Sequence, residues 1–455
     1  IPWYIPDDLK HFKKHTINNI VIMGSSTFLA LPPQNQPLPN RHHIVITNNP
    51  NQHNLLPFHS NSSVQFMTFN DCLDYLHSLT DKHITTHNRP IHYVIGGEQV
   101  YNLFKPYITH IHVTHITHNS SDISFDKFFF QIPTSFHIHD YSPLYHYNNL
   151  SYRFINYRLD NNNTHCSFDS SYLNLCKHVL DSGETRTDRT GTGTISIFGQ
   201  QMKFDISNYI PVLTTKRIPW KSCIQELLWF LKGHTNSKEL DSKGVKIWND
   251  NSSTDFLQKN GLSHLNEGDC GANYSFQWKH FGATYIDCHT DYSNKGFDQI
   301  SYIEHLLKNE PTSRRIFLSA WNPPDLQNTV LPPCHVSCQF YVDSNRKLSC
   351  HLYQRSCDMF LGVPWNILSY SILTYILAFR NNLTPGTLIV STGDTHLYSD
   401  HIDKINTQLQ RSPITYPKLH LSDSIRTKNI DDIHIDDFEL IGYFPHPTIK
   451  AHMSV

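Results

Sequence analysis

The sequence predicts an α/β fold in two parts, a mostly parallel sheet near the N-terminus followed by a larger α+β domain. Short apolar runs that end in turn residues recur at residues 20–24, 44–46 and 93–95, and helix-forming stretches lie between them. The chain has 455 residues, which exceeds one ordinary core because most domains hold about 100–200 residues. A polar stretch without hydrophobic periodicity, residues 159–170, is typical of a linker between the two parts.

The first predicted domain covers residues 1–158. Its apolar runs suit buried strands, and their alternation with short helices is typical of a mostly parallel sheet. Residues 136–138 and 152–155 flank a polar turn near its end and predict an antiparallel hairpin.

The second predicted domain covers residues 171–455. Strongly apolar stretches at residues 226–231 and 369–379 predict buried helices. No stretch approaches the roughly 18 apolar residues that span a bilayer, so no membrane segment is expected.

Charge and cysteine content narrow the function classes. Lys plus Arg is 37 against Asp plus Glu 39, a net charge of −2, so neither nucleic acid nor a membrane is an expected partner. Ten cysteines without a paired motif suit a reducing compartment, and we expect a cytoplasmic protein. The chain begins at Ile1 rather than Met, which leaves an upstream targeting signal open.

The 32 histidines predict no metal site, because no His-x-x-x-His pair is accompanied by converging Cys or Glu ligands.

Cys334 is the candidate nucleophile of the second domain. A lone cysteine is more often a small buried hydrophobic residue. Arginines beside Gly, Ser or Thr in residues 188–194, 313–315 and 353–358 favour a different role for it. Guanidinium groups bind phosphate oxygens with paired hydrogen bonds, so these segments predict a phosphate monoester site, although each arginine alone could be a surface residue.

Strings in a fixed order over residues 171–455 resemble the thymidylate synthase family. The strings are DRTGTGT (188–194), TTKR (214–217), ELLWFL (226–231), SRRI (313–316), SAWNP (319–323), LPPCH (331–335), LYQRSCDMFLGVPWNI (352–367), GDTHLYSDH (393–401) and the terminal PHPTIKAHMSV.

This resemblance implies methylation of dUMP to dTMP with methylenetetrahydrofolate as co-substrate. The Cys334 thiolate would add to carbon six of the uracil ring, and Arg355 would supply the positive charge that favours the thiolate. Arg189 and Ser356 would join Arg355 in holding the nucleotide phosphate.

Arg314 and Arg315 would reach the same phosphate from a partner subunit, so the resemblance implies a homodimer. Glu226 would organise water and proton transfers, because a buried carboxylate is costly unless it is used or paired. Asp358 would bind the folate pterin.

The remaining implied residues surround the two substrates. Asn366 offers one amide donor and one acceptor, which suits uracil, whereas aspartate there would suit cytosine. The C-terminal residues through Val455 would close as a lid. The resemblance also implies that Trp248 and Asn251 line the folate slot, and that Tyr274, His396 and Tyr398 assist proton transfer and hold the sugar.

Five strings in the first domain, also in order, resemble the dihydrofolate reductase family. They are IPWYIPDDLKHF (1–12), VIMGSSTF (21–28), PLPNR (37–41), VIGGEQVY (94–101) and HVTHI (112–116). By itself Asp8 suits a helix N-cap. The resemblance instead implies that Asp8 pairs with the pterin, with Thr114 supporting it, while Phe12 stacks on the folate and Arg41 clamps its glutamate tail.

The same resemblance implies NADPH as the hydride-carrying cofactor. Gly96 and Gly97 would let the backbone approach the cofactor, and Thr27 and Thr47 would add hydroxyl groups to its phosphates. The chain would therefore also reduce the dihydrofolate product to tetrahydrofolate.

Several positions depart from the two family patterns. Ser25, Ser26 and Asn48 stand where basic residues usually contact the cofactor phosphates, which bears on NADPH affinity. Asn249, the loop at 272–275 and Trp365 differ from the synthase pattern and are expected to affect folate affinity more than the chemistry.

A further departure concerns the start of the first domain. The first strand of the reductase family would precede Ile1. Because that strand lies inside the sheet, its absence leaves two unpaired edges, and we expect the natural chain to be longer by about 20 residues.

Two alternative functions stay open at this point. One is an active synthase fused to an inactive reductase-like scaffold. The other is a hydroxymethylase acting on deoxycytidylate, which Asn366 disfavours.

Overall fold

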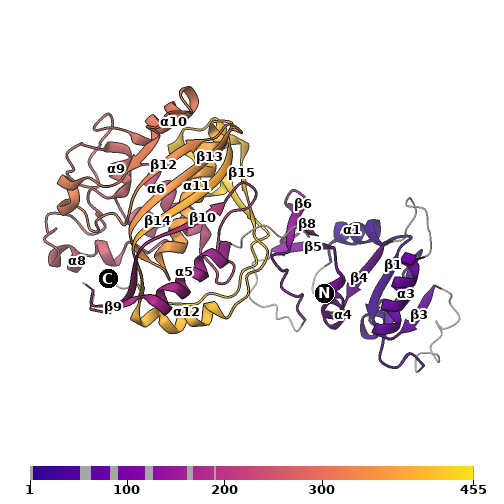
Figure 1. The fold of residues 1–455 in the computed structure, drawn as a ribbon. Coiled ribbons are helices and arrows are strands. Elements are labelled where there is room, and N and C mark those ends of the chain that lie inside the picture. The colour runs from indigo at the N-terminus through magenta and orange to yellow at the C-terminus, as the bar shows by residue number, and fades with distance from the viewer. Residues whose placement is uncertain are drawn as a thin grey trace. The chain divides into compact units, whose positions relative to one another are not determined.

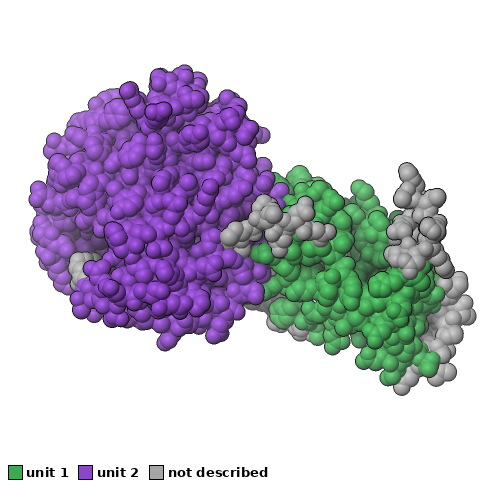
Figure 2. Space-filling view, viewed as in Figure 1, with its two compact units in different colours: residues 1–161 green, residues 162–455 purple. Residues whose placement is uncertain are grey.

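The computed structural model describes residues 4–51, 63–81, 91–117, 127–160, 168–188 and 191–453. The chain divides into two compact units, residues 1–161 and 162–455 (Figure 1), which Figure 2 colours separately. Each unit has its own core and is described by itself.

Unit 1 contains the predicted parallel sheet. Strand β1 (Ile20–Gly24) lies between β2 (His42–Ile46) and β4 (His92–Gly96), and β3 (Val64–Met67) pairs with β2; every pairing is parallel. Short helices follow β1, β3 and β4, in line with the alternation that the sequence predicts. The helices of this unit are α1 (Pro6–Thr16), α2 (Ser25–Leu29), α3 (Phe69–Asp81) and α4 (Glu98–Phe104).

A second sheet of unit 1 is antiparallel. It orders β5 (His110–Thr117), β8 (Leu150–Leu159) and β6 (Phe136–Tyr141), and β7 (Tyr145–Tyr147) also pairs with β8. The predicted hairpin is therefore confirmed. Within the described residues β3 and β4 are the edge strands of the parallel sheet, and β5 and β6 are the outer strands of the antiparallel one.

Unit 2 is built on a six-stranded sheet of order β11-β12-β13-β14-β10-β9. The strands β13 and β14 are parallel to each other and the other pairings are antiparallel. The strands are β9 (Glu184–Arg186), β10 (Thr194–Asp205), β11 (Phe317–Ser319), β12 (His335–Val342), β13 (Lys347–Asp358) and β14 (Thr384–Tyr398), with a separate hairpin of β15 (Lys418–Leu421) and β16 (Phe438–Ile441).

Helices cover one face of this sheet. Helices α5 and α11 pack on β13, β14 and β10, and α6 packs on α11, which gives one continuous apolar core. The helices of unit 2 are α5 (Phe168–Ser182), α6 (Trp220–Leu231), α7 (Lys238–Asp241), α8 (Thr254–Lys259), α9 (Tyr274–His280), α10 (Gln299–Asn309), α11 (Gly362–Arg380) and α12 (Ile402–Leu409).

The two ends of the predicted linker, residues 159–170, differ from the sequence expectation. Strand β8 continues to Leu159 and α5 already begins at Phe168, so both ends of the predicted linker belong to regular elements.

Helix α11, at 19 residues, is long and apolar enough to cross a membrane by length and composition, contrary to the expectation that no stretch qualifies. Most of this helix is buried against β13, β14 and α6, as in the core helix of a folded domain.

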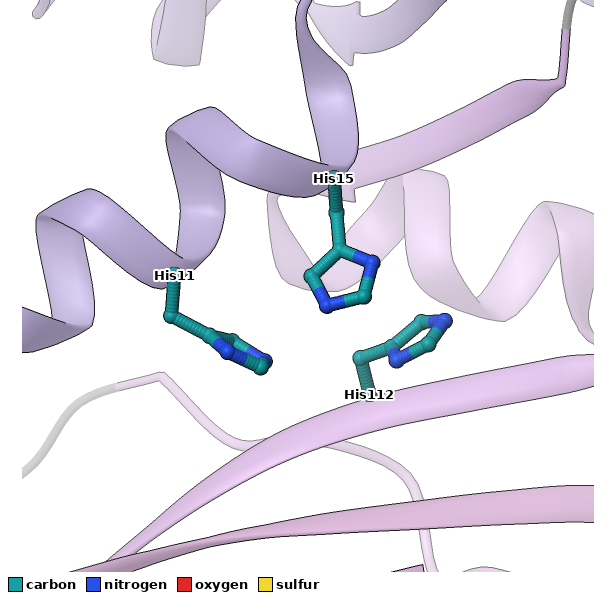
Figure 3. Close-up of side chains that lie close together, drawn as sticks. All are labelled: His11, His15 and His112. Atoms are coloured by element: carbon teal, nitrogen blue, oxygen red, sulfur yellow. The ribbon is translucent and has the colours of Figure 1, made fainter.

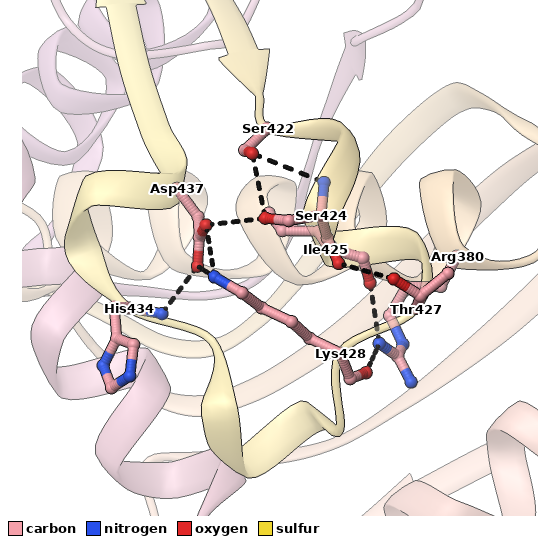
Figure 4. A network of polar contacts seen from close by, with 8 residues as sticks. All are labelled: Arg380, Ser422, Ser424, Ile425, Thr427, Lys428, His434 and Asp437. Carbon is pink, nitrogen blue, oxygen red and sulfur yellow. Dashed lines mark hydrogen bonds and ion pairs between the residues drawn. The ribbon is translucent and has the colours of Figure 1, made fainter.

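A polar network fixes the C-terminal segment on the end of α11 (Figure 4). Asp437 accepts hydrogen bonds from Lys428 Nζ at 2.7 and 2.8 Å and from Ser424 Oγ at 3.0 Å. Arg380, at the end of α11, donates to the carbonyls of Ile425 at 2.8 Å and Lys428 at 2.6 Å. Each of these hydrogen bonds has a charged donor or acceptor, and such bonds are stronger than those between neutral groups. Together they attach residues 424–437 to the end of α11.

Candidate active sites

Cys334 lies in the turn that leads directly into β12, and its side chain is half-buried. Its backbone N–H donates to Tyr274 Oη at 2.7 Å, and its carbonyl accepts from the Arg355 N–H at 2.8 Å. Tyr274 is the first residue of α9 and Arg355 lies near the end of β13, so three elements fix the position of this cysteine.

The Arg355 guanidinium lies beside the same turn. Its Nε donates to the Pro333 carbonyl at 2.8 Å and its Nη2 donates to Pro332 at 2.7 Å, while its centre lies 5.3 Å from the Trp321 ring. Burial raises the pKa of the Cys334 thiol, and the Arg355 charge acts in the opposite direction. Arg355 is therefore the cation placed to favour the thiolate.

Glu226 is buried on α6 between two indole rings. Trp248 Nε1 donates to its Oε1 at 2.8 Å and Trp365 Nε1 donates to its Oε2 at 2.6 Å. Burial raises the pKa of Glu226 to about 7, and the two N–H groups oppose that shift because they stabilise the ionised form. A carboxyl group with such a pKa exchanges protons readily near neutral pH.

The ends of β13 and β14 bring more predicted residues to this region. Asp358 pairs in register with His396, and Asp358 Oδ1 accepts from the Phe360 N–H at 2.9 Å in the turn before α11. His396 Nδ1 lies 3.0 Å from the Asp394 carboxylate. Other predicted residues lie on β13, β14, α11 and the segment before α8: Ser356, Tyr398, the half-buried Asn366 near the start of α11, and the buried Asn251.

Two further predicted phosphate residues lie on the surface of unit 2. Arg314 and Arg315 are exposed between α10 and β11, as expected of residues that serve a neighbouring subunit. Arg189 and Val455 lie outside the described residues, so their roles stay predictions.

In unit 1 the structure places Asp8 against Thr114. Thr114 Oγ1 donates to Asp8 Oδ1 at 2.5 Å, across 106 positions of sequence. The N-cap of α1 is Ile5, without a side-chain cap bond, so Asp8 is not the N-cap that its sequence position alone suggests. On the same helix Phe12 lies 5.7 Å from the buried Arg41 guanidinium, which Thr16 holds through a 2.9 Å bond to Nε.

The predicted cofactor residues gather at the carboxyl ends of β1, β2 and β4, where ligands bind in parallel sheets. Thr27 is in α2 directly after β1, and Thr47 follows β2. Gly96 has φ +116°, a conformation that favours glycine, and a Cβ on Gly97 would lie 3.3 Å from Thr27 Oγ1. A close backbone approach beside the Thr27 hydroxyl group fits a dinucleotide cofactor.

Sequence reasoning missed two features of these sites. Trp365 was expected to bear on folate affinity, yet it contacts Glu226 directly. His11 and His15 meet His112 on β5 (Figure 3), although the sequence predicts no metal site. The spacing of four positions between His11 and His15 on α1 is visible in the sequence. No sequence pattern connects these two residues with His112 on β5.

Comparison with known proteins identifies two families in this chain. The thymidylate synthase family matches residues 170–455, and the dihydrofolate reductase family matches residues 1–159. A bifunctional dihydrofolate reductase-thymidylate synthase of Paramecium tetraurelia is 41% identical over 100% of this chain and 95% of its own length, and one of Zea mays is 38% identical over 100% and 93%. The human thymidylate synthase is 52% identical over 62% of this chain and 90% of its own length. The chain therefore belongs to the family of bifunctional dihydrofolate reductase–thymidylate synthases.

Proposed function

We propose that Cys334 is the nucleophile that methylates dUMP. Its thiolate adds to carbon six of uracil, and the electron pair moves to carbon five, which attacks the methylene carbon of methylenetetrahydrofolate. Loss of the carbon-five proton expels tetrahydrofolate, which then returns a hydride to the methylene carbon as the thiolate leaves. The products are dTMP and dihydrofolate. The contact of Cys334 with Tyr274 and Arg355 is the observation that carries this assignment.

Glu226 handles protons during this sequence. With a pKa raised to about 7 by burial, it is present in both protonation states near neutral pH. Trp248 and Trp365 hold its two oxygens, so the carboxyl group keeps one orientation, and no described residue forms an ion pair with it that would fix its charge.

The synthase half acts as a homodimer in which each site takes Arg314 and Arg315 from the partner. Three aromatic side chains of the six-stranded sheet support this: Tyr341 is 68%, Phe317 46% and Tyr353 43% exposed. Exposed apolar groups of this kind mark interaction surfaces. A second copy packed against this sheet would cover them, and closed two-fold dimers are the commonest assemblies.

Complementation tests the shared site. Cys334→Ala and the double variant Arg314→Ala/Arg315→Ala should each be inactive alone. After mixing and subunit exchange, half of the dimers are mixed and each contains one intact site, so about one quarter of wild-type activity should return. Lys308→Ala with Lys347→Ala, which removes two exposed positive charges elsewhere, is the control and should stay active. Absence of recovery in exchanged dimers would show that each site uses its own arginines.

The reductase half recycles the dihydrofolate product. Thr27, Thr47, Gly96 and Gly97 would hold NADPH, which would supply the hydride, while Asp8 would orient the pterin and promote its protonation. Within the described residues of unit 1, the contact between Asp8 and Thr114 supports an active reductase rather than the inactive-scaffold alternative. The free thiols of the described cysteines suit a reducing compartment such as the cytoplasm.

A further inference from the structure

Three histidine rings converge between α1 and β5. His11 and His15 lie one turn apart on α1 and point toward His112 on β5 (Figure 3). One ring nitrogen from each histidine lies within 4.8 Å of the other two. His15 and His112 have ring centroids 4.5 Å apart, as do His11 and His15.

We propose that His11, His15 and His112 form a binding site for a divalent transition-metal ion of the zinc type. Imidazole nitrogen suits zinc, and three protein ligands plus water is a common tetrahedral arrangement. Zinc–nitrogen bonds of about 2.0–2.1 Å place tetrahedral ligands about 3.4 Å apart, so the rings need shifts of only about 1 Å to close on an ion.

A hydrogen-bonded chain behind His112 prepares it as a ligand. The Asp140 carboxylate can only accept, so the Asn156 amide turns its NH₂ group toward Asp140. The Asn156 carbonyl oxygen therefore faces His112 Nδ1, at 2.6 Å, and accepts a hydrogen bond from the Nδ1–H group. That bond places the proton of the neutral ring on Nδ1 and leaves the lone pair on Nε2, as partners behind a metal-binding histidine usually do.

The other two rings are also prepared for a metal ion. His11 stacks on Phe154, with ring centroids 3.9 Å apart and planes 10° from parallel, which limits its rotation. Burial lowers the pKa of His11 and His15, and the neighbouring His112 acts in the same direction, which favours the neutral form of both rings. His112 is exposed and the other two are half-buried, so an ion and a water ligand can enter from solvent.

The site adjoins the reductase residues but does not use them. On α1, Asp8 lies three positions before His11, and on β5 Thr114 lies two positions after His112. The proposal is independent of reductase activity, because it depends only on the positions of the three rings and of Asn156.

Zinc binding to the chelator-stripped full chain tests the proposal. Competition with a chromophoric chelator should show one saturable site per chain with Kd at or below about 1 µM, equivalent to roughly −8 kcal/mol. Cobalt(II) at this site should give the visible bands of tetrahedral nitrogen ligation without thiolate charge-transfer absorption, which distinguishes it from binding to Cys334.

Variants identify the ligands. His15→Asn and His112→Asn should each weaken zinc binding roughly 100-fold or more, and Asn156→Ala, which removes no ligand, should weaken it about 10-fold to 100-fold. His146→Asn is the matched control, because that exposed histidine of β7 contacts Ser151 instead and should leave affinity unchanged. No saturable site below about 100 µM zinc, or equal affinity in wild type and both ligand variants, would overturn the proposal.

Discussion

The Trp365 indole N–H donates a 2.6 Å hydrogen bond to Oε2 of Glu226, across 139 positions of sequence. Trp248 donates to the other oxygen, so among the described residues this buried carboxyl group is held by two neutral donors and by no cation. A hydrogen bond to the charged form lowers the pKa of a carboxyl group, whereas burial raises it. The value of about 7 for Glu226 is the balance between these two effects.

Trp365→Phe should therefore move the pH dependence of thymidylate synthesis upward. Loss of the N–H donor destabilises the ionised carboxylate, and a hydrogen bond to a charged group contributes about 1.5–3 kcal/mol, or about one to two pH units. The measurement is the pH profile of kcat/KM for dUMP.

Trp229→Phe is the control for this variant. Trp229 is buried on the same helix as Glu226, and its Nε1 has no hydrogen-bond partner in the described structure. This change should lower stability without moving the profile. An unchanged profile in Trp365→Phe would mean that the indole N–H does not tune Glu226.

Asp8→Asn should reduce dihydrofolate reduction by about 100-fold or more, because the amide cannot provide the carboxylate that promotes pterin protonation. Asp7→Asn is the matched control, since the neighbouring Asp7 is exposed and pairs with Lys10. Synthase activity of the same protein serves as the internal standard for folding. Equal reductase rates in Asp8→Asn and wild type would favour a different acid.

Thr114→Val should lower the reductase rate by about 10-fold through loss of the 2.5 Å bond to Asp8, while Thr114→Ser should retain most of it. Measurement of kcat and KM for dihydrofolate separates a defect in orientation from a defect in packing. A serine variant as slow as the valine variant would show that the methyl group, not the hydroxyl group, matters.

Asp437→Asn should destabilise unit 2 by roughly 1.5–3 kcal/mol at pH 7. Burial acts to raise the pKa of Asp437, but the His434 N–H and Lys428 outweigh it, so the pKa is lowered. A lowered pKa means that this stabilisation is present above the unfolded-state pKa, about 3.9, and is lost as the pH falls through the folded-state value.

Urea unfolding at pH 7 and near pH 3 measures this effect. The difference between wild type and variant should shrink at the lower pH. Asp436→Asn, at the exposed neighbouring position, should match wild type at both. A difference that does not change with pH would assign the loss to packing rather than to charge.

Sequence patterns predict the local parts of this fold well and the long-range contacts poorly. The strands of unit 1 follow from short apolar runs, but the bond between Asp8 and Thr114 joins elements that no local pattern connects. Composition also cannot distinguish a core helix from a membrane span, as α11 shows, because both are uniformly apolar.

Departures from a family pattern carry information that the pattern itself lacks. From the sequence, Trp365 is only a departure from the family pattern. The structure shows that it contacts Glu226, which lies on another helix. Likewise, nothing in the sequence distinguishes His112 from the other 31 histidines, and only the fold places it beside His11 and His15.

The most direct measurement compares dUMP binding with dTMP formation in Cys334→Ala. Removing the sulfur takes away the nucleophile but leaves the arginines that hold the phosphate. Thymidylate formation should fall by at least about 10⁴-fold, while the Kd for dUMP stays within about tenfold of wild type. Turnover within about tenfold of wild type would contradict the assignment of Cys334 as the nucleophile.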